Sequence, residues 1–172
     1  MITLHRLGPS HAEAIIRGQD ELLATEVFGG RWQDQALFEF LDRAERWQPD
    51  GPLREHAALL EGSGTLVGGG GLHLLGAGLE PGEAALTYWV LPAHRGQGLG
   101  AAIAQALVDR ARCDPRIEQL VLRIAPQNTP SAAIARLIGA APTGRTERHP
   151  ADAARIVDRW TLSTDPPLDS PR

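Results

Sequence analysis

The chain has little cysteine, no excess of basic charge and no long apolar run. A single cysteine, Cys113, excludes an intramolecular disulfide and fits a reducing compartment. The net charge of −4 gives no basic surface of the kind that binds nucleic acid. No apolar stretch approaches the roughly 18 residues of a membrane helix, and the N-terminus lacks a signal-peptide pattern. We therefore expect a cytoplasmic protein that binds neither nucleic acid nor membrane.

The length and the composition of the C-terminus predict one domain with a short tail. A chain of 172 residues suits a single domain with an adequate core. Residues 164–172 hold three prolines in a polar context, which predicts a loose tail. We therefore assign residues 1–163 to the domain and 164–172 to the tail.

Periodicity and turn signals predict an order of strands and helices along the chain. A capping box at Ser10–Glu13 predicts the start of the first helix, and Asp34 is expected to cap the second. The glycine run 68–71 has no helix after it, so we interpret it as a strand that another backbone approaches closely. Residues 141–154 show no clear pattern. Expected strands are 2–7, 56–60, 65–75, 84–91, 120–124 and 155–162; expected helices are 10–23, 34–47, 98–112 and 129–138.

The most informative segment is an apolar strand that runs through an Arg-led glycine turn into a helix. Glycines let a ligand come close to backbone N–H groups, and the helix adds its unpaired first-turn donors, so a diphosphate fits there. The segment has no Lys-Ser or Lys-Thr pair for a P-loop, and its glycine spacing does not fit the dinucleotide motif. It matches Arg-x-x-Gly-x-Gly at Arg95, Gly98 and Gly100. A plain glycine turn is the alternative.

With Val90 and Pro92 ahead of it, this pattern resembles the acetyl-coenzyme A (acetyl-CoA) signature of the GNAT superfamily of N-acetyltransferases. A second segment strengthens the resemblance: Asn128 follows a strand, Ser131 comes three residues later, and Gly139 begins a Gly-Ala pair that closes the helix. The N-terminal helix pair and a Trp before the glycine loop are most similar to the ribosomal-protein-alanine N-acetyltransferase branch. The resemblance implies an α/β (α+β) fold with a largely antiparallel, splayed sheet of six or seven strands and about four helices.

The resemblance also implies acetyl-CoA as cosubstrate. Val90 and Leu91 would pair with the pantetheine arm, and a backbone N–H near them would polarise the thioester carbonyl. Asn128 would bond the arm from the opposite side, or serve only as a helix cap. The Arg95 side chain would add charge at the pyrophosphate. The loop residues expected to hold the pyrophosphate are Arg95, Gly96, Gln97, Gly98, Leu99 and Gly100.

The usual catalytic acid of the superfamily is missing from this sequence. Many members have a Tyr seven residues beyond the Asn, where this chain has Ala135. Ser131 is therefore the first candidate for protonating the leaving thiolate, although a Ser in a first helical turn often only satisfies backbone donors. Tyr88, the only tyrosine, is expected to pack or to line the substrate site.

The general base is also not the usual one. The strand Glu often found in the ribosomal-protein branch is Ala85 here, and strand alternation puts Glu83 on the same face. Glu83 is a candidate base acting through water, or simply a solvated strand-end carboxylate. His73 is the other candidate, because imidazole exchanges protons near neutral pH, or it has a structural role. Glu26 and Trp32 are expected to line the acceptor site.

The function predicted is direct transfer of an acetyl group to a primary amine, small molecule or peptide, in a ternary complex without a metal. We call the glycine loop of residues 95–100 the cradle. Cys113 lies at the far end of the helix that begins there, about 20 Å away, which argues against an acyl-enzyme. The acidic balance mildly favours a cationic acceptor. A homodimer is the one assembly we consider. The alternative function is a non-catalytic acyl-CoA sensor or interaction module, which the missing Tyr and Glu suggest.

Overall fold

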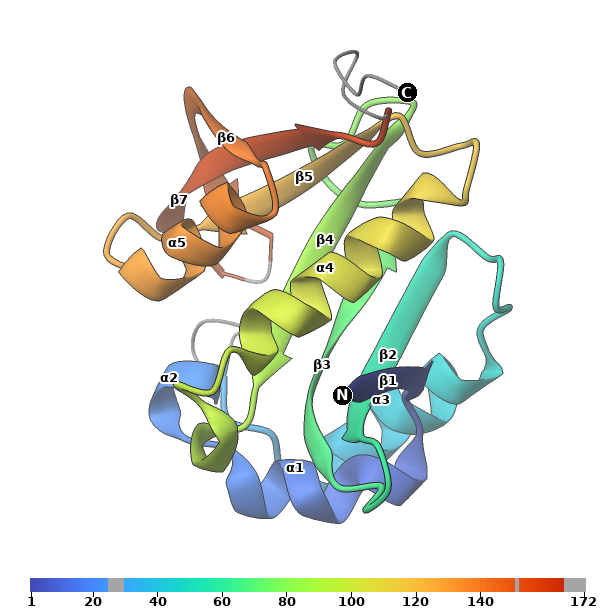
Figure 1. The fold of residues 1–172 in the computed structure, drawn as a ribbon. Helices are drawn as coiled ribbons and strands as arrows, with labels where there is room; N and C mark the ends of the chain where they lie inside the picture. Colours follow the sequence, from blue (N-terminus) through green and yellow to red (C-terminus); the bar gives the residue numbers. More distant parts are fainter. Residues whose placement is uncertain (25–29, 151, 166–172) are drawn as a thin grey trace.

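The computed structural model describes residues 1–24, 30–150 and 152–165, which fold around one mixed sheet (Figure 1). Seven strands of these residues form the sheet in the order β1-β2-β3-β4-β5-β7-β6, and β4 with β5 is its parallel pair. This confirms the predicted mixed, largely antiparallel sheet. In chain order the elements are β1 (Ile2–Arg6), η1 (Pro9–His11), α1 (Ala12–Gly18), α2 (Glu21–Leu23), α3 (Asp34–Arg46), β2 (Leu53–Leu60), β3 (Leu66–His73), β4 (Glu83–Val90), η3 (Pro92–His94), α4 (Leu99–Arg112), β5 (Gln119–Ile124), α5 (Thr129–Leu137), β6 (Ala141–His149) and β7 (Asp152–Ser163).

Helices cover both faces of the sheet and divide the core into two clusters. On one face α4, which forms where a helix was predicted, buries Ile103 and Leu107 against the sheet, and Figure 1 shows α4 crossing the middle of the molecule. On the other face α1 and α3 pack with Trp89 of β4. Side chains alternate along a strand, so β4 contributes Tyr88 and Val90 to the first cluster and Trp89 to the second. β4 therefore links the two layers. Among the described residues no helix is long and apolar enough to span a membrane.

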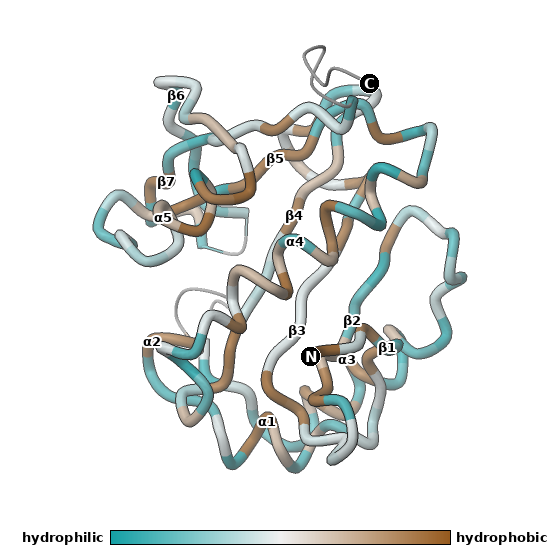
Figure 2. The backbone as a smooth tube through the Cα atoms, in the orientation of Figure 1, coloured by the Kyte–Doolittle hydropathy of each residue, from teal (hydrophilic) through white to brown (hydrophobic). Residues whose placement is uncertain are grey.

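The glycine run lies in β3, which confirms the predicted strand, and side chains approach it closely on both faces. A Cβ atom added to Gly70 would lie 2.7 Å from Leu107 Cδ1 of α4. A Cβ atom added to Gly69 would lie 2.7 Å from Cζ2 of Trp89. Figure 2 shows the middle of β3 as a pale segment of intermediate hydropathy. Glycine is needed here because the sheet lies in contact with α4 and with the Trp89 ring.

The expected first helix, 10–23, is wrong as one continuous element. The Ser10 capping box does not form; instead the Gly8 N–H donates to His11 Nδ1 (3.1 Å) within a 3-10 turn. The chain is extended at Gln19, whose side-chain amide bonds the main-chain O and N–H of Trp32 at 2.9 and 3.0 Å. This tertiary contact ends α1 before α2 begins. The N-cap of α3 is Gln33 rather than the expected Asp34, which is instead the first residue of the helix.

The C-terminal region contains a strand that the sequence did not reveal. β6 lies within residues 141–154, where no pattern was seen, and it pairs with β7 as an antiparallel hairpin, with His149 beside Asp152 and Ala141 beside Thr161. Nearly all of its side chains are exposed, so the alternation of apolar and polar residues that marks a half-buried strand is missing.

The predicted loose tail does not begin at Thr164. The Thr164 side chain is buried and its Oγ1 donates to the Ile117 carbonyl (2.6 Å), while its N–H donates to the Glu118 carbonyl. Thr164 therefore closes the domain. The rest of the predicted tail, 166–172, lies outside the described residues.

Candidate functional site

β4 and β5 separate after a short paired stretch. Their parallel register begins with Glu83 beside Gln119 and ends with Ala85 beside Val121, whereas β4 continues to Val90. Figure 1 shows the two strands diverging from this paired end. Backbone groups on the separated edges are left for a ligand or water, because a buried N–H or C=O requires a partner.

The register against β3 decides which β4 amides face the separated edge. The Leu91 N–H donates to the Val67 carbonyl of β3 (2.8 Å), and the Leu91 carbonyl accepts from the His94 N–H (2.9 Å). Both backbone groups of Leu91 are therefore used within the protein, which corrects its predicted pairing with pantetheine. By antiparallel alternation, the N–H groups of Tyr88 and Val90 point toward β5 instead.

The loop after β4 presents an uncapped helix N-terminus. Gly96 and Gly98 have φ of +74° and +77°, which glycine adopts without strain, and Gly98 is the N-cap of α4. Within the described residues no side chain caps α4, and no atom lies within 4 Å of a Cβ built on either glycine. The first-turn N–H groups can therefore bind an anion. Gly100 has a packing role as well, because a Cβ there would lie 2.9 Å from Ile134 Cδ1 of α5.

Arg95 braces this loop against the N-terminal region. Its Nε donates to the Val90 carbonyl (3.3 Å), and its two terminal nitrogens donate to the Asp20 carboxylate at 2.5 and 3.0 Å. Asp20 also accepts from the Leu23 N–H and so caps α2. The hydrogen bond from Arg95 lowers the pKa of Asp20. The guanidinium is thus paired with a carboxylate, a partner that the sequence did not predict.

The N-terminus of α5 forms the opposite wall. Asn128 Oδ1 accepts from the Ser131 N–H (3.2 Å), which confirms the capping role weighed for Asn128. The Ser131 carbonyl accepts from the Tyr88 hydroxyl (3.3 Å). Burial raises the pKa of Tyr88 above its ordinary value, so the phenol keeps its proton at neutral pH. Ala135, at the position of the usual family Tyr, is fully buried.

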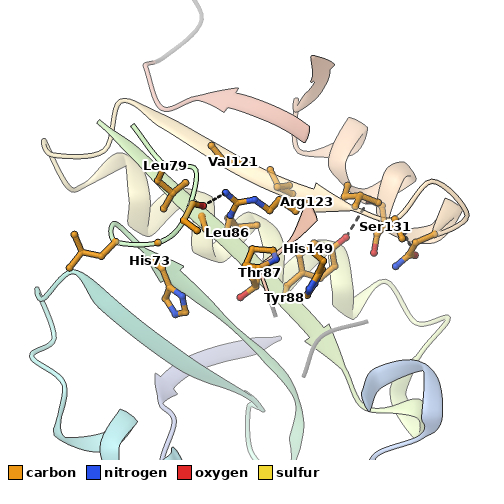
Figure 3. Close-up of a pocket in the computed structure, with 18 residues that line it drawn as sticks. His73, Leu79, Leu86, Thr87, Tyr88, Val121, Arg123, Ser131 and His149 are labelled. Atoms are coloured by element: carbon orange, nitrogen blue, oxygen red, sulfur yellow. Dashed lines mark hydrogen bonds between the residues drawn. The ribbon is translucent and has the colours of Figure 1, made fainter. Parts of the chain in front are cut away.

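A cavity of about 260 Å³, which we call the first cavity, lies between β4 and β5 and reaches Asn128 and Ser131 at the start of α5. Figure 3 shows His73 toward one side of it and Ser131 toward the other, with Thr87 and Tyr88 next to each other between them. Arg123 lines it as well and donates to the Ala77 carbonyl (2.7 Å) in the loop before β4. In the parts of the chain that the structure describes, no cluster of His, Cys, Asp or Glu could hold a metal ion.

Comparison with known proteins gives this arrangement a family. Residues 2–141 match the model of the Acetyltransferase (GNAT) domain. The chain belongs to the GNAT acetyltransferase family. No curated protein sequence matches it. The family model does not single out the ribosomal-protein-alanine branch.

Solved GNAT structures share the fold at low sequence identity. A GNAT-family acetyltransferase from Bacillus anthracis is 15% identical with a TM-score of 0.76. Spermidine N-acetyltransferase from Vibrio cholerae, solved with CoA and spermine, is 16% identical with a TM-score of 0.77. An aminoglycoside acetyltransferase solved with coenzyme A has the same identity, 16%, and a TM-score of 0.77. Each alignment covers 95% of this chain and 95% of the other.

On the other face of the GNAT sheet, a hydrogen-bonded pair lies beside a second cavity of about 210 Å³. His73 Nε2 lies 2.8 Å from Oε1 of Glu55. Glu55 is not among the site residues predicted from the sequence. Only the pairing of β2 with β3 brings Glu55 and His73 together, and the sequence does not specify that pairing. His73 and Thr87 line both cavities. Trp32, predicted to line the acceptor site, lines the second cavity, whereas Glu26 lies outside the described residues.

Glu83 lies at the paired end of β4 and is held in a network of ions. Its carboxylate accepts from Arg159 (2.6 Å) and from the Glu80 N–H (3.0 Å), and Arg159 also bonds Glu147 (2.6 Å). Burial raises the pKa of Glu83, but the hydrogen bonds from Arg159 and the Glu80 N–H outweigh it, so the pKa falls below its ordinary value. A carboxylate held in this way accepts protons poorly. The structure therefore does not bring Glu83 to the cavity as a base.

Proposed function

We propose that this GNAT protein uses acetyl-CoA as cosubstrate and transfers the acetyl group directly to a primary amine. The observation that carries the proposal is continuity: the open N-terminus of α4, the β4 edge at Tyr88 and Val90, and the first cavity follow one another. A diphosphate, an amide-bearing arm and a thioester need those three environments in that order. The coenzyme A named for the spermidine and aminoglycoside acetyltransferase structures supports the assignment.

The cradle binds through its backbone. The N–H groups of 95–100 hold the pyrophosphate, and each charge-assisted hydrogen bond contributes about 1.5–3 kcal/mol. Arg95 keeps the loop in place through Asp20 and the Val90 carbonyl, and adds its charge nearby. Asn128 uses its Oδ1 for the α5 cap, so its side-chain NH₂ is the group left for the pantetheine arm.

The chemistry needs a polarised carbonyl and a proton for the thiolate. The backbone N–H of Tyr88 faces the separated edge and polarises the thioester carbonyl. Ser131, beside it in the first cavity, donates the proton to the leaving thiolate. Transfer is direct because the one cysteine, Cys113, is exposed at the C-terminal end of α4.

The acceptor is a primary amine that reaches the thioester from the face of His73 and Thr87. The spermidine and aminoglycoside enzymes act on amines according to their names, which supports this acceptor class. Membership of the ribosomal-protein-alanine branch, a cytoplasmic location and a homodimer stay predictions.

A titration and an assay test the proposal. Calorimetric titration with acetyl-CoA and with its dephospho and desulfo analogues measures affinity and locates the binding energy. Thiol release is then followed across a panel of primary amines. Amine-dependent thiol release supports the enzyme, and binding without turnover on any amine favours the acyl-CoA sensor. Absence of acetyl-CoA binding would reduce residues 95–100 to a plain turn.

A further inference from the structure

The second cavity combines the hydrogen-bonded pair of Glu55 and His73 with an aromatic wall. We infer that His73 is the base that deprotonates the acceptor, that Glu55 positions it, and that the second cavity takes a small primary monoamine with a flat apolar body. This inference rests on the proposed acetyl transfer and names its acceptor class.

Glu55 and His73 come from neighbouring antiparallel strands. Glu55 of β2 lies opposite Gly71 of β3, and His73 lies two residues further along β3, so the two side chains are diagonal neighbours on one face. Their side chains are 11% and 29% exposed. The carboxylate is thus largely shielded, while the imidazole keeps access to the cavities. Trp47 packs its edge against the His73 ring, with centroids 6.3 Å apart.

Glycine at position 71 makes room for the pair. A Cβ atom there would lie 2.7 Å from Glu55 Oε1 and 2.9 Å from His73 Nε2. Both distances are too short for a carbon contact, so any side chain at this position would displace the hydrogen bond. The Gly71 N–H itself bonds Thr87 Oγ1 (3.2 Å). The strand backbone therefore leaves the space that the pair fills.

The hydrogen bond determines which imidazole nitrogen accepts a proton. An ionised carboxylate only accepts, so Nε2 of His73 carries the hydrogen directed at Glu55, and Nδ1 keeps the lone pair. The acceptor ammonium gives one proton to Nδ1, and the amine lone pair attacks the thioester carbonyl carbon. The C–N bond forms and the C–S bond breaks. The nitrogen then gives its second proton to Ser131 Oγ as Ser131 gives its own proton to the leaving thiolate, so Ser131 ends unchanged, and His73 releases the first proton to solvent.

The position of His73 fits a base that acts between two substrates. His73 and Thr87 are lining residues of both cavities, the first on the thioester side and the second beneath α1 and α3. An amine that enters the second cavity therefore meets His73 before it meets the thioester. Glu83 has no such position, because Arg159 holds it at the paired end of β4.

The rest of the second cavity is apolar and aromatic. Trp32 and Phe40 stack with centroids 5.4 Å apart, and Trp89 completes the aromatic wall. Flat side chains of this kind favour a flat or apolar body next to an ammonium group. Apart from Glu55, His73 and Thr87, the described lining is apolar or aromatic: Leu7, Ile15, Trp32, Leu37, Phe40, Leu41 and Trp89.

Charge and size narrow the acceptor. Glu55 is the single carboxylate among the described lining residues, which matches one ammonium group rather than the several of a polyamine or an aminoglycoside. The volume of about 210 Å³ is below the range of about 300–1,000 Å³ that holds drug-sized ligands. A small arylalkyl monoamine satisfies both limits.

The first experiment compares acceptors for the wild-type protein. Steady-state thiol release is measured with 2-phenylethylamine, spermidine and an alanine-headed tripeptide amide. We expect kcat/KM for 2-phenylethylamine to exceed the other two by about tenfold or more. Phe40→Leu should raise KM for 2-phenylethylamine, whereas Phe38→Leu, at a half-exposed position of the same helix, serves as the matched control. A preference for spermidine or for the peptide would overturn the acceptor class.

The second experiment separates a base from a structural pair. His73→Asn should lower kcat with 2-phenylethylamine by about 100-fold, with the Kd of acetyl-CoA unchanged as evidence of an intact fold. Glu55→Gln should lower kcat in the same direction, and Glu61→Gln in the exposed β2–β3 turn is its control. With 2,2-difluoro-2-phenylethylamine, whose ammonium loses its proton more easily, the deficit of His73→Asn should shrink to about tenfold or less. An equal deficit with both amines would overturn the base.

These results distinguish failure of the inference from failure of the proposed function. If the wild-type protein acetylates the amine and neither His73→Asn nor Glu55→Gln lowers kcat, the inference is refuted and the proposed acetyl transfer still stands. Binding of acetyl-CoA with no thiol release from any of the amines sinks both.

Discussion

His56 makes the stability of this protein sensitive to mild acid. The side chain is 7% exposed on β2, and its Nδ1 has no hydrogen-bond partner among the described residues. Burial, followed by the positive charge of Arg110, lowers the pKa of His56 from 6.5 to about 4, and Arg54 adds to the effect. The folded protein therefore holds this imidazole neutral at a pH where the unfolded chain would protonate it.

The sign and size of the effect follow from that difference. Because the folded pKa lies below the unfolded one, the unfolded chain takes up the proton first as the pH falls, and the free energy of unfolding decreases. With a pKa of 6.5 unfolded and about 4 folded, the loss between about pH 7.5 and pH 4.5 is about 2.5 kcal/mol. Glu83, Glu147 and Asp114 have lowered pKa values, so their contributions decline mainly below this window.

Urea unfolding followed by tryptophan fluorescence measures this loss for the wild type and for His56→Gln, which cannot titrate. The difference in unfolding free energy between the two should change by about 2.5 kcal/mol across the window, in favour of the variant at low pH. His5→Gln, an exposed position of β1, is the matched control and should keep the wild-type slope. Parallel curves for wild type and His56→Gln would refute the reasoning, because the remaining groups, His11 included, are common to both.

Two further predictions concern the proposed site. Gly98→Ala should weaken acetyl-CoA binding about tenfold by calorimetry, because φ of +77° strains any side chain by about 1–2 kcal/mol; Gly62→Ala, with φ of +86° in a distant turn, should cost similar stability and leave affinity unchanged. Ser131→Ala should lower kcat for thiol release more than acetyl-CoA affinity. Equal losses in both would leave Ser131 with only its place in the α5 cap.

Much of the fold could be predicted because its signals are local. The strand, glycine turn and α4 in succession need only neighbouring residues, and so does the Asn128 cap of α5. β6 escaped prediction because its exposed side chains carry no alternation, and the first helix was predicted too long because Gln19 bonds Trp32 across the fold. Patterns fail where a distant contact competes with local preference.

The site shows the same division. Local patterns were enough to predict the pieces that lie together along the chain: the cradle with Gly96 and Gly98, and the Asn and Ser at the start of α5. The charge pairs needed the folded chain, because they join residues far apart: Arg95 to Asp20 across 75 positions and Arg159 to Glu83 across 76.

Those pairs changed the interpretation of the site. Arg95 has a carboxylate partner in Asp20, and the predicted base Glu83 is held by Arg159. A third long-range contact brings Glu55 beside His73. The physical reason is that a side chain's charge acts over a few ångströms in space. Distance along the chain says nothing of that until the strand register is fixed, and a one-residue slip would turn the strand residues among them, such as Glu55 and Glu83, to the other face.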